Sequence, residues 1–299
     1  MWQTETVAAM LEASGMQTRI NSMETIGDRV LDTCIAKIGS KGVFTVELEE
    51  QLAAGITDIA VHSAKDMQSR LPDGFCLIAF SEREKVCDVL VSRRKDINLD
   101  DSGQKLTVGT SSVRRRAFLR RAYPHLNIVE MRGNLQTRIK KMDAGTCDAL
   151  MLAYAGVKRM GYEEMIVREF DPDQFIPPVG QGCIAVEAAK SLDPEKLKKI
   201  RACINNRESE ICLLAERAFL RVLEGGCSIP AFGRAVLQDD KVVLKAGLSS
   251  LDGSRVIDFC EEGSADDPEE LGRRAGLAIL RDGGSEMLEE IRRVQAQEE

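Results

Sequence analysis

Residues 105–141 read KLTVGTSSVRRRAFLRRAYPHLNIVEMRGNLQTRIKK. A short apolar strand is predicted over 107–109 and a helix over about 112–122, and the pattern repeats with a strand over 127–131 and a helix over about 135–145. Strands that alternate with helices of this length are typical of parallel sheets in an α/β fold. This stretch therefore predicts the fold class.

The alternation continues on both sides of this stretch, with helices predicted over 4–14, 46–54 and up to about 160, and strands over 17–23, 58–62, 74–80, 89–92 and 148–153. The last third differs, because two helices precede three strands that read as a meander: helices over 192–202 and 209–223, strands over 231–237, 241–249 and 254–261, and a helix over 268–282. The sequence thus predicts an α/β part followed by a small C-terminal α+β domain.

The same opening stretch is strongly basic. It holds ten Lys and Arg residues against Glu130 alone, so it carries a charge of +9 in a chain whose formal net charge is −7. Dense arginine in an otherwise acidic protein indicates a site for an anion with several carboxylates or phosphates.

The position of three arginines strengthens this interpretation. Ser111 or Ser112 is a good N-cap, which places Arg114, Arg115 and Arg116 in the first helical turn, where the helix dipole disfavours cations. A bound anion would offset that cost, and the helix N-terminus would donate N–H groups to it. The alternative is a solvated basic face.

Three segments each lead out of an apolar strand: VHSAKD over 61–66, VGTSS over 108–112 and MRGN over 131–134. Ligands of open α/β sheets bind beyond the carboxyl ends of the strands, so these loops are expected to meet at one crevice. Lys65 and Asp66 end the first loop. There, Asp66 is suited to stabilise a developing positive charge or to move a proton, and the alternative is a surface ion pair.

Nine cysteines are scattered along the chain without a C-x-x-C pair, which favours a reducing compartment over disulfides or a metal site. Cys227 follows two glycines and is the candidate for a covalent site. The only histidines, His62 and His125, have no partner nearby in the sequence to form a Cys–His site. The loop around Lys41 lacks the spacing of a P-loop.

Composition excludes several classes of protein. Aromatic residues make up 4% of the chain, and the total charge is acidic, so nucleic acid is not an expected partner. No apolar run is long enough for a membrane span, and MWQTETVAAM lacks the pattern of a secretory signal, so a cytoplasmic protein is expected.

Eight motifs together resemble the porphobilinogen deaminase (hydroxymethylbilane synthase) family, in its order and spacing. They are KIGSKGVF over 37–44, DIAVHSAKD over 58–66, VGTSSVRR over 108–115, MRGNLQTR over 131–138, AGVKR over 155–159, PVGQG over 178–182, AERAF over 215–219 and EGGCSIP over 224–230.

The resemblance implies two α/β domains like those of periplasmic binding proteins, over 1–82 with 183–203 and over 87–178, and a C-terminal α+β domain over 206–299. It also implies a monomeric transferase of heme and tetrapyrrole biosynthesis. Such an enzyme joins four porphobilinogen molecules head to tail, releases ammonia and yields hydroxymethylbilane.

By the same resemblance, a dipyrromethane cofactor is bound through a thioether to Cys227, and Asp66 is the catalytic carboxylate. The residues implied to contact cofactor, substrate or its linear oligomers are Lys41, Ser63, Lys65, Thr110, Ser112, Arg114, Arg115, Arg132, Gly133 and Arg138, with Asp28 and Asp88 as further candidates. Arg116, Arg120 and Arg121 are expected at the surface.

The chain departs from the family in two places. The family begins with a strand and a T-R-x-S-x-L-A motif before the position of Trp2, and it usually has D-P-R-D where this chain has Lys85-Val86-Cys87-Asp88. The alternative is therefore an N-terminally truncated homologue with little or no activity. A plain anion-binding module of periplasmic type is a third possibility, against which the missing signal and the Gly-Gly-Cys loop count.

Overall fold

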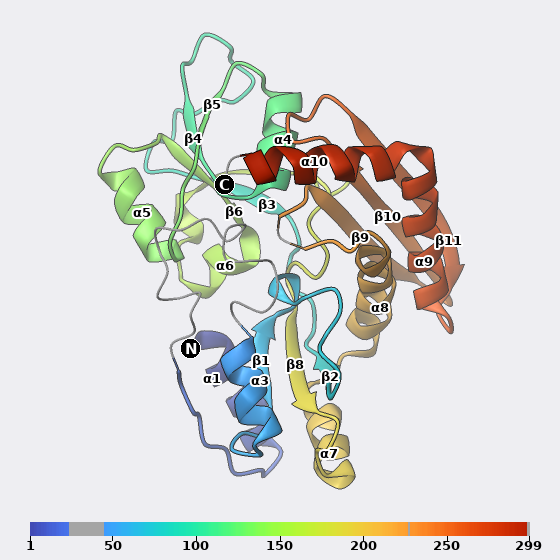
Figure 1. Ribbon diagram of the computed structural model, residues 1–299. Coiled ribbons are helices and arrows are strands. Elements are labelled where there is room, and N and C mark those ends of the chain that lie inside the picture. Colours follow the sequence, from blue (N-terminus) through green and yellow to red (C-terminus); the bar gives the residue numbers. More distant parts are fainter. Residues whose placement is uncertain (24–44, 227, 298–299) are drawn as a thin grey trace.

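The computed structural model describes residues 1–23, 45–226 and 228–297. These residues form three sheets, each with its own helices, and we refer to them as the first, second and third units (Figure 1). In Figure 1 the first unit lies at the bottom, the second at the upper left and the third at the right. Lys41, Asp28 and Cys227 lie outside the described residues.

The first unit is a three-stranded antiparallel sheet in the order β1-β8-β2. Val7 and Leu11, in the helix over Trp2–Ala13, pack with Ile200 and Ile204, in the helix over Pro194–Ile204. All four lie on apolar residues of the strands. Its elements are α1 (Trp2–Ala13), α3 (Val46–Ala53), β1 (Ala60–Ser63), the 3-10 turn η2 (Ala64–Asp66), β2 (Phe75–Phe80), β8 (Ile184–Ala189) and α7 (Pro194–Ile204).

The second unit is a five-stranded sheet in the order β5-β4-β6-β3-β7. Every residue of its central strands β3 and β6 is buried, which is typical of a sheet covered on both faces. Its elements are β3 (Asp88–Val91), β4 (Thr107–Gly109), α4 (Val113–Ala122), β5 (Asn127–Val129), α5 (Leu135–Asp143), β6 (Ala149–Ala153), α6 (Tyr154–Arg159), η3 (Glu163–Met165) and β7 (Ile166–Glu169).

The third unit is an antiparallel meander in the order β11-β10-β9, whose core includes residues of three helices. Gly272 lets two of these helices approach closely, because a Cβ there would lie 2.0 Å from the carbonyl oxygen of Ala215. Its elements are α8 (Arg207–Val222), β9 (Ala231–Gln238), β10 (Lys241–Ser249), β11 (Val256–Ser264), α9 (Pro268–Ile279), the π-helical turn η4 (Leu280–Gly284) and α10 (Ser285–Gln297).

Two segments cross between the first and second units, one over 81–87 and one over 170–183. They run side by side, since the Glu84 amide donates to the Gly182 carbonyl at 2.9 Å and the Gln181 side chain donates to the Val86 carbonyl at 2.7 Å. Gly182 has a positive φ of 90°, and a Cβ there would lie 2.4 Å from the Glu84 carbonyl oxygen. The crossing therefore requires glycine at this position.

A buried carboxylate from the third unit holds both crossing segments. Glu216 on α8 is 0% exposed and accepts hydrogen bonds from Arg83 at 2.5 and 3.1 Å and from the amide of Gly180 at 2.8 Å. It also accepts from the amide of Ala235 on β9 at 2.8 Å. One side chain thus joins the third unit to the crossing between the other two.

The predicted fold class, two α/β units and a small C-terminal α+β unit, is confirmed, with corrections. Residues 17–23 form no strand, β7, β8 and α10 were not predicted, and parallel pairing is confined to β4 with β5 and β6. Ile20 is 39% exposed, so residues 17–23 have no apolar face to bury against a neighbouring strand. The domain boundaries stay predictions.

Candidate active site

Asp66 lies at the end of η2, directly after β1. Its side chain is exposed and makes no hydrogen bond or ion pair with a described residue. The backbone of Gly180 packs closely against this turn, since a Cβ at Gly180 would lie 2.8 Å from the carbonyl carbon of Ala64. Gly180 also has a positive φ of 76°. A firmly held backbone with an unpaired carboxylate is the arrangement that a ligand group could use.

Arg138 of α5 faces the same space from the second unit. Its Nε donates to the Gly133 carbonyl at 2.7 Å, and both Nη groups have no hydrogen-bond partner in the described part of the chain. Burial lowers the pKa of Arg138, the charge of Arg115 lowers it further, and the charge of Asp66 opposes both. The charges of Arg115 and Asp66 therefore both act on Arg138, and these three residues lie in or just after the three loops that were expected to converge.

Asp88 on β3 is the buried partner of the two arginines that begin α4. Arg114 donates to its Oδ2 at 2.6 Å, while Arg115 donates to its Oδ1 from Nε at 3.0 Å and from Nη2 at 2.8 Å. Gln181 of the crossing segment adds a third donor to Oδ1 at 3.0 Å. The carboxylate of Asp88 therefore offsets part of the cost of placing two arginines at the N-terminus of α4.

Electrostatics keeps Asp88 ionised. Burial alone would raise the pKa of Asp88, but the charges of Arg114 and Arg115, with hydrogen bonds from Arg115 and Gln181, hold it well below its ordinary range. Two buried cations against one carboxylate leave one positive charge, and the buried Nε of Arg114 has no partner among the described residues. Asp88 is 0% exposed, and its carboxylate positions the two arginines. Its expected contact with a ligand stays a prediction.

Three of the predicted residues have local structural roles. Ser112 is the N-cap of α4 and accepts from the Arg115 amide at 3.4 Å, and the buried Thr110 accepts from the Ser112 amide at 3.3 Å. Gly133 has a φ of +108°, and a Cβ there would lie 2.8 Å from the Thr137 side chain. These contacts fix the two strand-to-helix turns that carry the arginines.

The remaining predicted contacts lie at the edges of this space. Ser63 ends β1 and accepts from the side chain of Gln3 at 2.8 Å, and Lys65 is half-buried in the next turn. Arg132 is half-buried and pairs with Glu130 through Nε at 2.6 Å. Of the expected surface arginines, Arg120 and Arg121 are exposed and Arg116 is half-buried.

The described cysteines are free thiols, and four of them are deeply buried. Burial raises the pKa of Cys87, Cys147, Cys183 and Cys212 to about 11, so these four are not available as nucleophiles. No group of His, Cys, Asp and Glu in the described ranges could hold a metal ion. His62 is a buried partner of Glu187, with Nε2 and Oε2 2.9 Å apart.

Sequence reasoning missed Arg159 and Gln181 as site residues. Arg159 is the last residue of α6, and its guanidinium lies 5.2 Å from the ring of Trp2. Burial lowers the pKa of Arg159, and nearby charges, among them those of Glu84 and Asp66, oppose this shift. Both residues stand in the motifs AGVKR and PVGQG, which carried the family resemblance. Nothing in the local sequence shows that these motifs meet the loop of Asp66.

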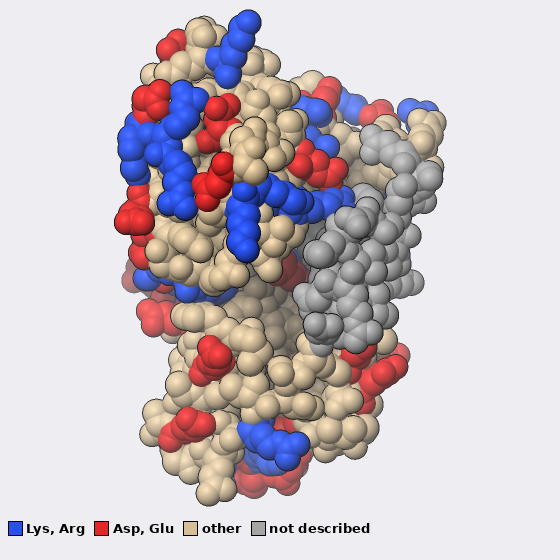
Figure 2. Space-filling model, turned by 90° about the vertical axis from the view of Figure 1, so that its left-hand side faces the viewer, with Lys and Arg blue, Asp and Glu red and all other residues tan. Residues whose placement is uncertain are grey.

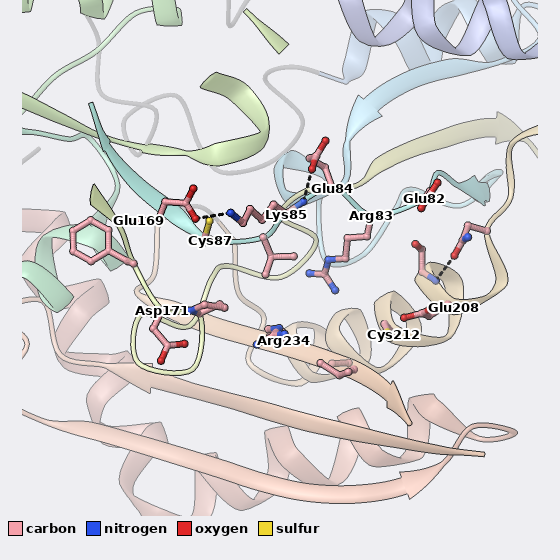
Figure 3. A pocket seen from close by; sticks show the side chains of 17 residues that line it. Glu82, Arg83, Glu84, Lys85, Cys87, Glu169, Asp171, Glu208, Cys212 and Arg234 are labelled. Atoms are coloured by element: carbon pink, nitrogen blue, oxygen red, sulfur yellow. Dashed lines mark hydrogen bonds and ion pairs between the residues drawn. The ribbon is translucent and has the colours of Figure 1, made fainter. Parts of the chain in front are cut away.

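Charge is unevenly distributed over the molecule. In Figure 2 Lys and Arg side chains gather over the upper half, and few lie on the lower half. A cavity of about 680 Å³ lies elsewhere, among the crossing segment over 82–87, residues 169–172, the start of α8 and β9 (Figure 3). None of the predicted site residues that the structure describes lines it.

The described residues fit a ligand with several carboxylates. Among the described residues, the Nη groups of Arg138 have no hydrogen-bond partner, and neither has the buried Nε of Arg114. Arg138 faces the site from the second unit, and Asp66, whose carboxylate has no partner among the described residues, lies in the first. Such a layout suits an anionic chain that acquires positive charge at one position.

Comparison with known proteins gives two family models over most of the chain. Porphobilinogen deaminase, dipyromethane cofactor binding domain, matches residues 1–198, and the porphobilinogen deaminase C-terminal domain matches residues 210–281. Solved structures show only a weak likeness: the VFT2 domain of Bordetella pertussis BvgS is 16% identical with a TM-score of 0.40, covering 67% of this chain and 76% of that one.

Curated relatives are similar over nearly the full length. The porphobilinogen deaminase of Desulfosudis oleivorans is 57% identical over 99% of this chain and 95% of its own. That of Cytophaga hutchinsonii is 50% identical over 98% and 94%. None of these comparisons favours the truncated, inactive alternative. On these matches, the chain belongs to the porphobilinogen deaminase family.

Proposed function

We propose that this protein is a working porphobilinogen deaminase, a transferase that joins four porphobilinogen molecules into hydroxymethylbilane, with Asp66 as its catalytic carboxylate. The observation that carries the proposal is the position of the Asp66 carboxylate in the field of Arg138. Neither this carboxylate nor the Nη groups of Arg138 have a partner among the described residues. The two charges do not neutralise each other in a contact ion pair, so each remains available to a ligand.

Asp66 acts on the positive charge that forms on the substrate. When the amino group of porphobilinogen leaves as ammonia, the pyrrole and its methylene carbon share that charge, and a nearby carboxylate lowers the energy of the cation. The methylene carbon then bonds to a pyrrole carbon of the growing chain, which loses its proton. Because the Asp66 side chain has no partner among the described residues, it needs no rearrangement to face the cation.

The arginines bind the acetate and propionate groups of the pyrroles. The two Nη groups of Arg138 have no hydrogen-bond partner in the described ranges, and such a pair of donors suits a bidentate contact with a carboxylate. Arg114 and Arg115 act through the excess charge that remains after pairing with Asp88, and Thr110, Ser112 and Gly133 hold the turns in place. Each added pyrrole brings two more carboxylates, which explains the density of arginine in the second unit.

The cofactor of the family is dipyrromethane, and we place its thioether at Cys227. When bound, this group supplies the pyrrole carbon to which the first substrate is joined. The proposal rests on the motif EGGCSIP, and the burial of Cys87, Cys147, Cys183 and Cys212 removes four competing thiols. Lys41 and Asp28 stay further candidates for ligand contacts on the strength of the sequence.

Intact-mass measurement of the purified chain tests this function. We expect a dipyrromethane adduct on the wild-type protein that is absent from Cys227→Ala and retained in Cys260→Ala, the control at an exposed cysteine. An unmodified wild-type protein without turnover of porphobilinogen would contradict the proposed activity. An adduct that persists in Cys227→Ala would instead move the attachment site.

The enzyme is further proposed to be a cytoplasmic monomer that uses neither nucleic acid nor a membrane as partner. The acidic total charge and the scarcity of aromatic residues support the first exclusion. No helix in the described parts is both long and apolar enough to cross a membrane. Gel filtration with light scattering is expected to give the mass of one chain.

A further inference from the structure

One side-chain contact bridges the first and second units close to Asp66. The ring of Trp2, the first residue of α1, lies 5.2 Å from the guanidinium carbon of Arg159, the last residue of α6. In Figure 1 α1 begins beside the label N, below α6. Cationic groups within about 6 Å of an aromatic centroid are attracted by the ring.

The first unit holds Trp2 in place. Val7 and Leu11 anchor α1 in the core of that unit, and Gln3 donates to Ser63 at 2.8 Å, three residues before Asp66. Trp2 is 44% exposed, so its ring contacts Arg159 without the residue being buried. A surface tryptophan with this anchoring is placed for contact rather than for core packing.

Arg159 keeps its hydrogen-bonding capacity in this contact. It makes no hydrogen bond or ion pair with a described residue, unlike Arg115, whose donors go to Asp88 and to backbone and side-chain oxygens. The face of a guanidinium rests on an aromatic ring while its N–H groups point outward in the plane. The contact with the ring thus orients the cation, and no described residue occupies its N–H donors.

We propose that Trp2 is a positioning residue, which holds Arg159 so that its N–H groups meet a carboxylate of the substrate beside Asp66. The contact joins residues from the two units, so it exists only while these units stand close together. It therefore links the orientation of Arg159 to the relative position of the two units. This inference rests on the proposed function.

Steady-state kinetics with porphobilinogen separates positioning from a structural role. We expect Trp2→Ala to raise KM about two- to fivefold with kcat nearly unchanged, as a cation–π contact at an exposed site implies. Trp2→Phe is expected to restore most of the loss, and Leu277→Ala, an equally exposed apolar residue on α9, to leave both constants unchanged. A normal KM in Trp2→Ala, or no rescue by Trp2→Phe, would overturn the proposal.

A double-mutant cycle tests whether Trp2 acts through Arg159. If Trp2 acts through Arg159, the KM of Trp2→Ala combined with Arg159→Gln is expected to equal that of Arg159→Gln alone. Independent, multiplying effects would overturn the link between the two residues.

Fluorescence gives a readout that does not need activity, because Trp2 is the only tryptophan. We expect Arg159→Gln to change its emission, and porphobilinogen to change it in Asp66→Asn. Identical spectra with and without Arg159 would overturn the contact. An inactive wild-type protein would count against the proposed function alone, since the emission of Trp2 would still test the contact.

Discussion

Asp88 and Arg115 share two hydrogen bonds to a single carboxylate oxygen, of 3.0 and 2.8 Å, and lie 27 positions apart in the sequence. Arg114 binds the other oxygen at 2.6 Å. This buried cluster joins β3 to the start of α4 and, through Gln181, to the crossing segments. It sets the charge of the second unit where the ligand is proposed to bind.

Removal of the Asp88 carboxylate is expected to destabilise the fold. Asp88→Ala leaves two buried guanidinium groups without their anion, a change that costs about 3–5 kcal/mol of unfolding free energy in comparable sites. Urea unfolding of the protein, followed by circular dichroism, measures this loss of stability. Asp96→Ala breaks only the exposed pair with Arg94 and is expected to leave the midpoint unchanged; an equal loss in both variants would contradict the role of burial.

The same cluster predicts a loss of stability in acid. The folded pKa of Asp88 lies below the unfolded value of about 3.9, so its contribution is fully present above pH 4 and is lost as the pH falls towards the folded value. Asp88→Asn is expected to flatten the stability profile below about pH 4, read from thermal unfolding at a series of pH values. A slope like that of the wild-type protein in this window would assign the acid sensitivity to other carboxylates.

Asp66→Asn is expected to lower turnover of porphobilinogen by about a hundredfold or more, the usual loss when one electrostatic stabiliser of a transition state is removed. The mass adduct is expected to remain, since the change keeps the size of the side chain. Asp73→Asn is the control, because Asp73 is an exposed carboxylate of the same unit. Turnover close to the wild-type rate in Asp66→Asn would remove Asp66 from the catalytic role.

Arg138→Leu is expected to weaken the binding of porphobilinogen about tenfold to a hundredfold, the contribution of one to two charge-assisted hydrogen bonds. The effect should appear in KM and diminish at high salt less than a surface effect would, because Arg138 is half-buried. The exposed Arg120, changed to Leu, supplies the matched control. Equal KM values for the two variants would argue against a specific carboxylate site at Arg138.

Local pattern predicted most elements because each depends on neighbouring residues. The strand over 107–109 and the helix behind Ser112 lie where alternation and capping place them. The strand β8 was not predicted, because it shows no alternation of apolar and polar residues. It is buried throughout and contains Glu187. The helix α10 was missed because it follows the break at Gly283, whose φ is +103°.

By itself, the sequence determined the family, the fold class, the basic character of one segment and the candidacy of Asp66 and Cys227, since motifs and charge are properties of the chain. Only the tertiary structure decided which charges are neutralised. It paired Arg114 and Arg115 with Asp88, left Arg138 and Asp66 without an ion pair among the described residues, and brought Arg159 to Trp2. The physical reason is that pairing of charges depends on distance and burial across strands and units, which no local pattern of residues specifies.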